Sequence, residues 1–120
     1  IYQLEDGLVK SNPEKLGKYF RENRIFLDSN TFKNDALVIK NVNSNTVYLK
    51  TETKTILAFN FDGFPYLGVW SKPDASFVCI EPWFNTADSV NSTGEFKDKE
   101  NILRLNPGEE FNASYSVEFF

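Results

Sequence analysis

The sequence predicts an all-β fold, either a β-sandwich or part of one. From about residue 24 onward, most apolar residues recur with period two, the spacing of a strand that buries one face. Asn, Asp, Gly and Pro separate these short runs at fairly regular intervals, as turns do in all-β proteins. A chain of 120 residues is long enough for one small core. We therefore expect residues 1–120 to be a single domain or fragment.

About eight short strands are expected among nine candidate segments. They lie within residues 2–9, 24–27, 36–40, 46–50, 55–59, 66–70, 77–81, 102–105 and 111–119. The pair 36–40 and 46–50 should form a hairpin around the Asn-rich turn 41–45. The last run alternates apolar and polar residues most cleanly, which predicts one buried and one solvent-facing side.

The connections also carry signals. Pro13 to about Glu22 is expected to form a short helix capped by Asn12, because proline is favoured at the first helical position. Residues 86–100 are polar and long for a connection, which favours a functional surface loop. Asn-Pro-Gly-Glu at 106–109 predicts a turn.

Composition excludes several classes of function. The chain has no His, so a Ser-His-Asp triad, a Cys-His dyad and an imidazole-bound zinc site are excluded. The net charge of -4 argues against a broad nucleic-acid surface. No segment approaches the roughly 18 apolar residues of a membrane span.

A single cysteine, Cys79, permits no internal disulfide and favours a reducing compartment, so we expect a cytoplasmic protein. The absence of Met suggests a processed or excised piece.

Glu81 is the first candidate for chemistry. Strand alternation places Phe77, Cys79 and Glu81 on one face, with Val78 and Ile80 on the other. A carboxylate held among apolar groups takes up a proton more readily, which suits a general base near neutral pH. The alternative is that Glu81 reaches solvent at the end of a strand that Pro82 terminates.

Aromatic residues surround Glu81 in the sequence. Such rings could stack against a sugar, while carboxylates and amides bind its hydroxyl groups. The four aromatic residues are Tyr66, Trp70, Trp83 and Phe84. Alternatively, Tyr66 and Trp70 fill a sandwich core. Gly68, between them, marks either a bulge or a close approach by a ligand.

Asp35 is the second acidic candidate. It precedes the apolar run 36–39, where its carboxylate could accept a hydroxyl hydrogen bond, or it could simply close a turn.

Four stretches together resemble aldose 1-epimerases (galactose mutarotases), in particular the LacX-like branch. Two are Leu-Gly-Val-Trp-Ser-Lys-Pro at 67–73 and Phe-Val-Cys-Ile-Glu-Pro-Trp at 77–83. Phe-Lys-Asn-Asp-Ala-Leu-Val-Ile at 32–39 and Leu-Asn-Pro-Gly-Glu-Glu-Phe at 105–111 fit the same family in the same order. The resemblance runs from about residue 32 to the end and implies the C-terminal part of a β-supersandwich.

The resemblance also implies a reaction. In this family a glutamate removes the proton of the anomeric hydroxyl while a histidine protonates the ring oxygen, so the ring opens and recloses as the other anomer. Neither a metal nor an organic cofactor is needed. Glu81 falls on the catalytic glutamate and Asp35 on a substrate-binding aspartate. Trp70 and Trp83 would line the sugar site. The substrate would be a free or phosphorylated aldohexose, with galactose and glucose both open.

The chain departs from the family because it supplies neither the histidines nor the sugar-binding arginine. The resemblance therefore implies a C-terminal fragment that holds the base without the acid. Such a piece alone should show little or no mutarotation, and it should self-associate through uncovered sheet faces. Neither a nucleic acid nor a membrane is expected as a partner. Two alternatives remain: a non-catalytic carbohydrate-binding β-sandwich, and a purely structural β domain whose aromatic residues are all core.

Overall fold

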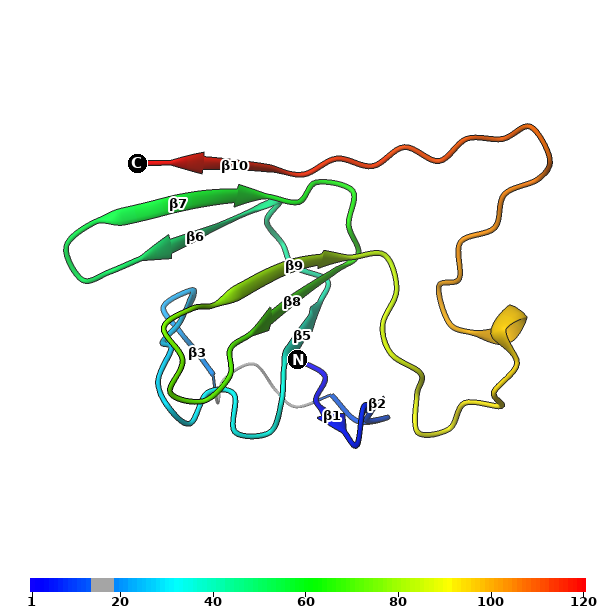
Figure 1. Cartoon of the computed structure of the whole chain (residues 1–120), viewed down its shortest axis with the longest axis horizontal. Coiled ribbons are helices and arrows are strands. Elements are labelled where there is room, and N and C mark those ends of the chain that lie inside the picture. Colours follow the sequence, from blue (N-terminus) through cyan, green and yellow to red (C-terminus); the bar gives the residue numbers. More distant parts are fainter. Residues whose placement is uncertain (14–18) are drawn as a thin grey trace.

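The computed structural model describes residues 1–13 and 19–120, which contain two three-stranded antiparallel sheets (Figure 1). The first sheet has the order β5-β8-β9, formed by Leu37–Lys40, Tyr66–Trp70 and Cys79–Trp83. The second has the order β10-β7-β6, formed by Ser116–Phe119, Thr55–Asn60 and Thr46–Lys50.

The remaining elements are small. Two hairpins of two-residue strands precede the sheets: β1 (Leu4–Glu5) with β2 (Leu8–Val9), and β3 (Phe20–Arg21) with β4 (Arg24–Ile25). A single 3-10 turn, η2 (Phe96–Asp98), interrupts the long segment after β9. No helix among the described residues has the length and apolarity needed to cross a membrane. The predicted all-β fold is confirmed.

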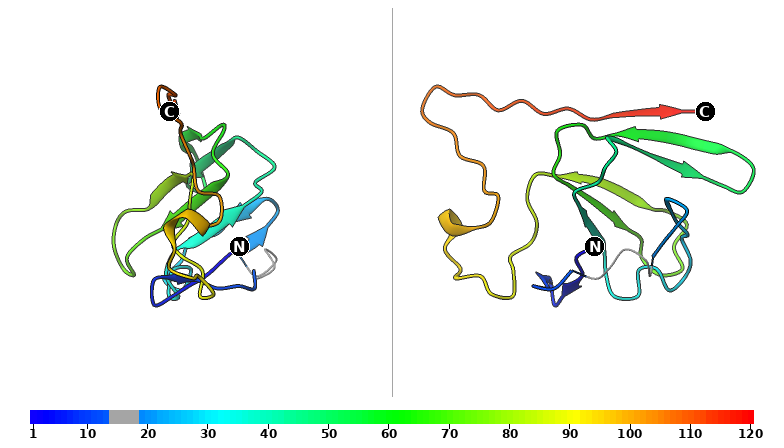
Figure 2. Two further views of the ribbon diagram at one scale, coloured as in Figure 1. Left: turned by 90° about the vertical axis from the view of Figure 1, so that its right-hand side faces the viewer. Right: turned by 180° about the vertical axis from the view of Figure 1, so that it is seen from behind.

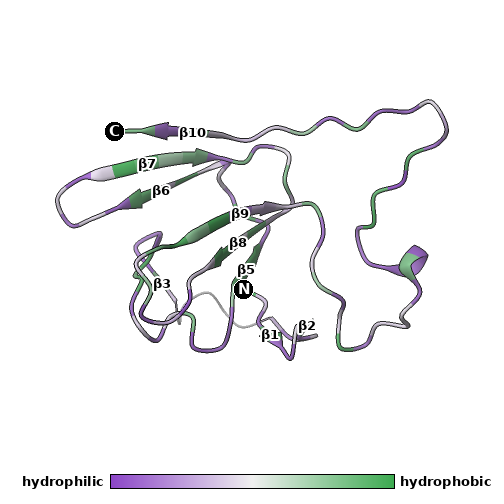
Figure 3. Cartoon of the chain, viewed as in Figure 1, coloured by the Kyte–Doolittle hydropathy of each residue, from purple (hydrophilic) through white to green (hydrophobic). Residues whose placement is uncertain are grey.

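The core lies on one face of the first sheet. Leu37 pairs with Val69 and Ile39 with Leu67, so these four side chains share a face. Phe59 and Phe61 bring the second sheet into the same cluster. The buried members are Ile1, Phe32, Leu37, Ile39, Phe59, Phe61, Leu67 and Val69. Apolar residues follow the strands of both sheets in Figure 3. A fully buried leucine such as Leu67 stabilises the fold by about 1.5–3 kcal/mol.

The expected hairpin between 36–40 and 46–50 is wrong. β5 pairs with β8, and β6 pairs with β7 across the short loop 51–54. Asn41, at φ 57°, turns the chain out of the first sheet directly after β5. Leu37, Val38 and Ile39 are all buried, so both faces of β5 are covered. At its two edges β5 pairs with β8 and with Tyr2, which leaves no edge for β6.

The expected helix from Pro13 to Glu22 is wrong over its described C-terminal end. Phe20 and Arg21 form β3, and Glu22 and Asn23 turn into β4 with φ of 52° and 58°. Two consecutive positive φ values are typical of a tight hairpin turn. Residues 14–18 of the expected helix lie outside the described residues.

Two C-terminal expectations also fail. Residues 102–105 form no strand, and in the run 111–119 only Ser116–Phe119 pairs, with all four residues exposed. The reason is the length of β7: Ser116 already pairs with Asn60, the last residue of β7, so the preceding residues have no strand beside them. Figures 1 and 2 show that the chain after β9 passes through η2 and then runs back, so that β10 lies beside β7. The turn at 106–109 is confirmed, since the Glu109 N–H donates to the Asn106 carbonyl at 3.0 Å.

Candidate active site

Strand β9 carries the main candidate residues. It is displaced by two residues from the expected strand at 77–81 and pairs with β8 through Trp83. Pro82 does not end the ladder but lies within it, opposite Leu67. Among the described residues β9 has a strand neighbour on one side only, and an edge strand tolerates a proline whose ring faces away from the ladder. Glu81 is therefore held within a strand rather than released at its end.

The two faces of β9 differ as alternation predicts. Val78 and Ile80 pack against the core, which leaves Cys79, Glu81 and Trp83 on the opposite face. All three are half-buried. We call this side of the first sheet the site face.

Trp83 contacts both Glu81 and Gly68. Its indole N–H donates a hydrogen bond to Glu81 Oε2 at 3.1 Å. Glu81 is paired with Gly68 of β8, and the indole lies over that glycine. A Cβ added at Gly68 would stand 2.8 Å from Trp83 Cζ2, closer than real Cβ contacts. The close approach at Gly68 is therefore made by Trp83.

Cys79 is the other titratable neighbour of Glu81 on β9. Burial raises the pKa of the Cys79 thiol, and the charge of Glu81 and a hydrogen bond to it raise that pKa further. Both the apolar surroundings and the carboxylate disfavour a thiolate here. The thiol therefore stays protonated beside Glu81 at neutral pH.

The aromatic residues of β8 have different environments. Tyr66 is 4% exposed, whereas Trp70 is half-buried and packs partly against the core. The centres of the Trp70 and Phe77 rings are 6.0 Å apart. In register, Tyr66 faces Trp83 and Trp70 faces Cys79. Trp70 and Glu81 are thus diagonal neighbours on the site face, and the core interpretation fits Tyr66 better than Trp70.

The Asp35 side chain makes its hydrogen bond within its own turn and not with the residues of β8 and β9. It adopts φ 74° just before β5, and its Oδ1 accepts the Ala36 N–H at 2.7 Å. Among the described residues, no hydrogen bond or ion pair joins its exposed side chain to Glu81. The geometry is that of the turn-closing alternative.

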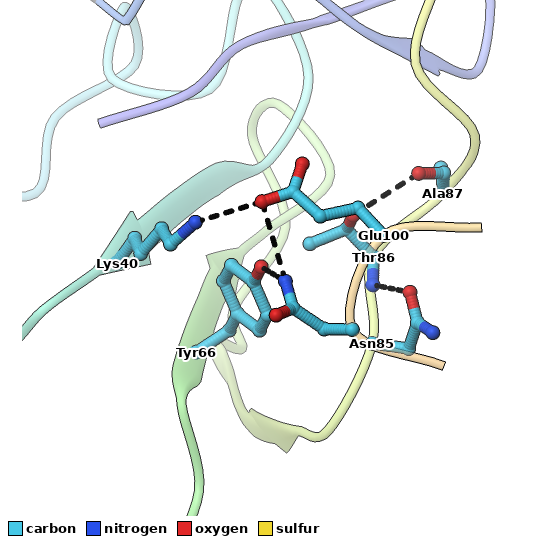
Figure 4. Close-up of polar contacts among 7 residues, drawn as sticks. Lys40, Tyr66, Asn85, Thr86, Ala87 and Glu100 are labelled. Atoms are coloured by element: carbon cyan, nitrogen blue, oxygen red, sulfur yellow. Dashed lines mark hydrogen bonds and ion pairs between the residues drawn. The ribbon is translucent and has the colours of Figure 1, made fainter. Parts of the chain in front are cut away.

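A polar cluster that was not predicted from the sequence lies at the other end of the site face (Figure 4). Lys40 of β5 forms an ion pair with Glu100 at 3.0 Å and lies 5.5 Å from the centre of the Tyr66 ring. The Asn101 amide donates to the Tyr66 hydroxyl and, at 3.4 Å, to Glu100. The hydrogen bond from Lys40 lowers the pKa of Glu100, and the same bond raises the pKa of Lys40. These residues are up to 61 positions apart, so no local pattern could have linked them.

Two surface cavities lie beside the site face rather than on it. One, of about 380 Å³, lies between the N-terminal hairpin and the segment 86–100. The other, of about 290 Å³, is lined by Ser71, Lys72 and Phe77, close to Trp70. Neither is lined by Glu81, which is half-buried on the site face. A general base must meet its substrate directly, so a sugar that reacts at Glu81 would lie outside both cavities.

Comparison with solved structures shows that the two antiparallel sheets match part of a galactose mutarotase-like fold. The crystal structure of a galactose mutarotase related enzyme from Lactobacillus acidophilus matches with a TM-score of 0.79 and 28% sequence identity. The match covers 99% of this chain but 40% of the enzyme. The sequence matches no protein-family model and no curated protein. The resemblance to the aldose 1-epimerase family is confirmed, while the LacX-like branch stays a prediction.

Proposed function

We propose that this chain is part of an aldose 1-epimerase-type isomerase that interconverts the α and β anomers of a free or phosphorylated aldohexose. The observation that carries the proposal is Glu81, half-buried in an edge strand, in a chain similar over 99% of its length to a galactose mutarotase related enzyme. Since the chain spans 40% of that enzyme, the activity of the whole protein is part of the proposal.

Glu81 would act as the general base. It takes the proton of the anomeric hydroxyl, whose O–H electron pair forms the C1 carbonyl as the bond between C1 and the ring oxygen breaks. The ring oxygen takes a proton from an acid. After rotation about C1–C2, the same steps in reverse give the other anomer. The sequence contains no histidine, so a histidine acid would come from outside residues 1–120.

The sugar would lie against the site face. Trp70 offers a half-buried ring for its C–H side, and Trp83 borders Glu81. Asp35 is the remaining candidate for a hydroxyl group, and its exposed carboxylate would have to turn from Ala36 toward the ligand. We propose a cytoplasmic location, which one unpaired cysteine suits.

Anomer exchange measured by NMR or polarimetry tests the proposal. In the complete protein, Glu81→Gln should lower the rate by about 10² to 10⁴, the usual contribution of a positioned base. Glu118→Gln on β10 serves as the matched control, since its side chain is exposed on the other sheet. An unchanged rate in Glu81→Gln would remove Glu81 from the mechanism. Sugar binding without any rate acceleration would favour the non-catalytic carbohydrate-binding module instead.

A further inference from the structure

The indole of Trp83 is engaged on two sides. Its N–H is donated to Glu81 Oε2, and its six-membered ring lies over Gly68, with the ring atoms Cζ2 and Cε2 2.8 and 3.0 Å from where a Cβ would be. Any other residue at position 68 would occupy the place of this ring. The indole N–H is therefore already used within the protein, and one side of the ring is covered.

The carboxylate of Glu81 accepts one hydrogen bond from an N–H group, at Oε2, and the Cys79 thiol, a weak donor, also hydrogen-bonds to the carboxylate. Among the described residues, no N–H or O–H group donates a hydrogen bond to the second oxygen, Oε1. A free glutamate side chain samples several rotamers, and an N–H donor to one oxygen favours the orientation that keeps this bond. Fixing one oxygen also fixes the direction in which the other points.

We propose, on the premise of the proposed function, that Trp83 is a positioning residue: in contact with Gly68, it holds Glu81 through Oε2 in the orientation in which the carboxylate receives the substrate proton. This role differs from stacking against the sugar, because Trp83 acts through Glu81. It also explains why a glycine stands opposite Glu81 in β8. A misplaced base loses much of its efficiency, since catalysis depends on the geometry of the reacting atoms.

The hydrogen bond can be tested without sugar or catalysis. The chain has two tryptophans, so ¹⁵N labelling gives two indole N–H signals, and Trp70→Phe assigns them. The Trp83 signal should shift in one step as acid protonates its carboxylate partner. Glu81→Gln should abolish this step, as should Gly68→Ala, which displaces the ring. Cys79, the neighbouring titratable group on β9, does not interfere, because its raised pKa keeps its titration in the alkaline range.

A Trp83 signal that is independent of pH, or that still shifts in Glu81→Gln, would overturn the inference. If Gly68→Ala fails to fold, Trp83→Phe in the complete protein provides the second measurement. A positioning role predicts a lower kcat with KM unchanged, whereas a raised KM with kcat unchanged identifies a sugar-binding residue and contradicts the inference. The indole titration requires no activity, so its failure is distinguishable from failure of the proposed function, which appears as an unchanged rate in Glu81→Gln.

Discussion

Glu81 lies between a thiol and an indole on the same strand face, and its neighbours follow from strand geometry. Residues two apart in a strand project to the same side, so Cys79 and Trp83 are its nearest side-chain neighbours along β9. The position of Cys79 beside Glu81, and the separation of both from Val78 and Ile80, was predictable from the sequence, whereas the expected strand 77–81 ended before Trp83. The place of Trp83 over Gly68 was not predictable, because it depends on the register between β8 and β9 and on Pro82 continuing the ladder.

The reactivity of Cys79 should report on the charge of Glu81. Because that charge contributes to the raised pKa of the thiol, Glu81→Gln should increase the thiolate fraction. We expect alkylation by iodoacetamide at pH 7.5 to accelerate, because the thiolate is the reacting form. Burial, the larger cause, remains in the variant. Glu118→Gln should leave the rate unchanged, and an equal acceleration there would show that the effect is not local to Glu81.

At the scale of elements, the sequence predicted strands better than their partners. Residues 36–40, 46–50, 55–59 and 66–70 all fall on observed strands, because period-two patterning reflects which face is buried. The same pattern does not show which neighbouring strand supplies the hydrogen bonds. It therefore placed β5 beside β6, when Asn41 in fact turns the chain away. Alternation in 111–119 likewise indicated a buried face that no other element of the described structure covers.

The ion pair between Lys40 and Glu100 attaches the segment after β9 to the first sheet, and its contribution should depend on pH. The pKa of Glu100 is lowered from 4.5, so its stabilisation is present above about pH 4.5 and is lost as the pH falls through the lowered value. The pKa of Lys40 is raised from 10.5, so its contribution is lost only as the pH rises through that raised value. The Glu100 side chain is 75% exposed, and an exposed pair is worth about 0.5 kcal/mol.

Urea unfolding of Glu100→Gln and of the wild type at two pH values tests this contribution. The free energies of unfolding should differ by about 0.5 kcal/mol at pH 7, and the difference should become smaller at pH 3, below the ordinary pKa of 4.5. Glu95→Gln, an exposed residue in the same segment, should show no such pH-dependent difference. A difference for Glu100→Gln that persists undiminished at pH 3 would mean that the loss is not electrostatic.

The molecule as a whole is more extended than a compact domain of its length. Its radius of gyration is 15.8 Å, against about 14 Å for 120 residues in a globular fold. The second sheet contributes to this shape. Register places Val47, Leu49, Leu57, Phe59, Val117 and Phe119 on one face. Phe59 is buried in the core, whereas Phe119 is 76% exposed. An apolar face of this kind favours association.

We expect chain 1–120 to self-associate through this face of β6, β7 and β10. Sedimentation velocity should show a mean mass that rises with concentration, and Phe119→Lys should shift the distribution toward monomer because it places a charge in the apolar face. Glu118→Gln, on the opposite face of the same strand, is the matched control. A monomer at every concentration would contradict the expectation.

The rate of anomer exchange in three forms of the complete protein decides whether Glu81 is the base and Trp83 holds it. If Glu81 is the base and Trp83 holds it, kcat should be highest in the wild type and lower in Trp83→Phe by roughly tenfold, the worth of one hydrogen bond to a charge. It should be lowest in Glu81→Gln, by about 10² to 10⁴. KM for the sugar should stay nearly constant across the three. Wild-type kcat in Glu81→Gln would contradict the claim outright.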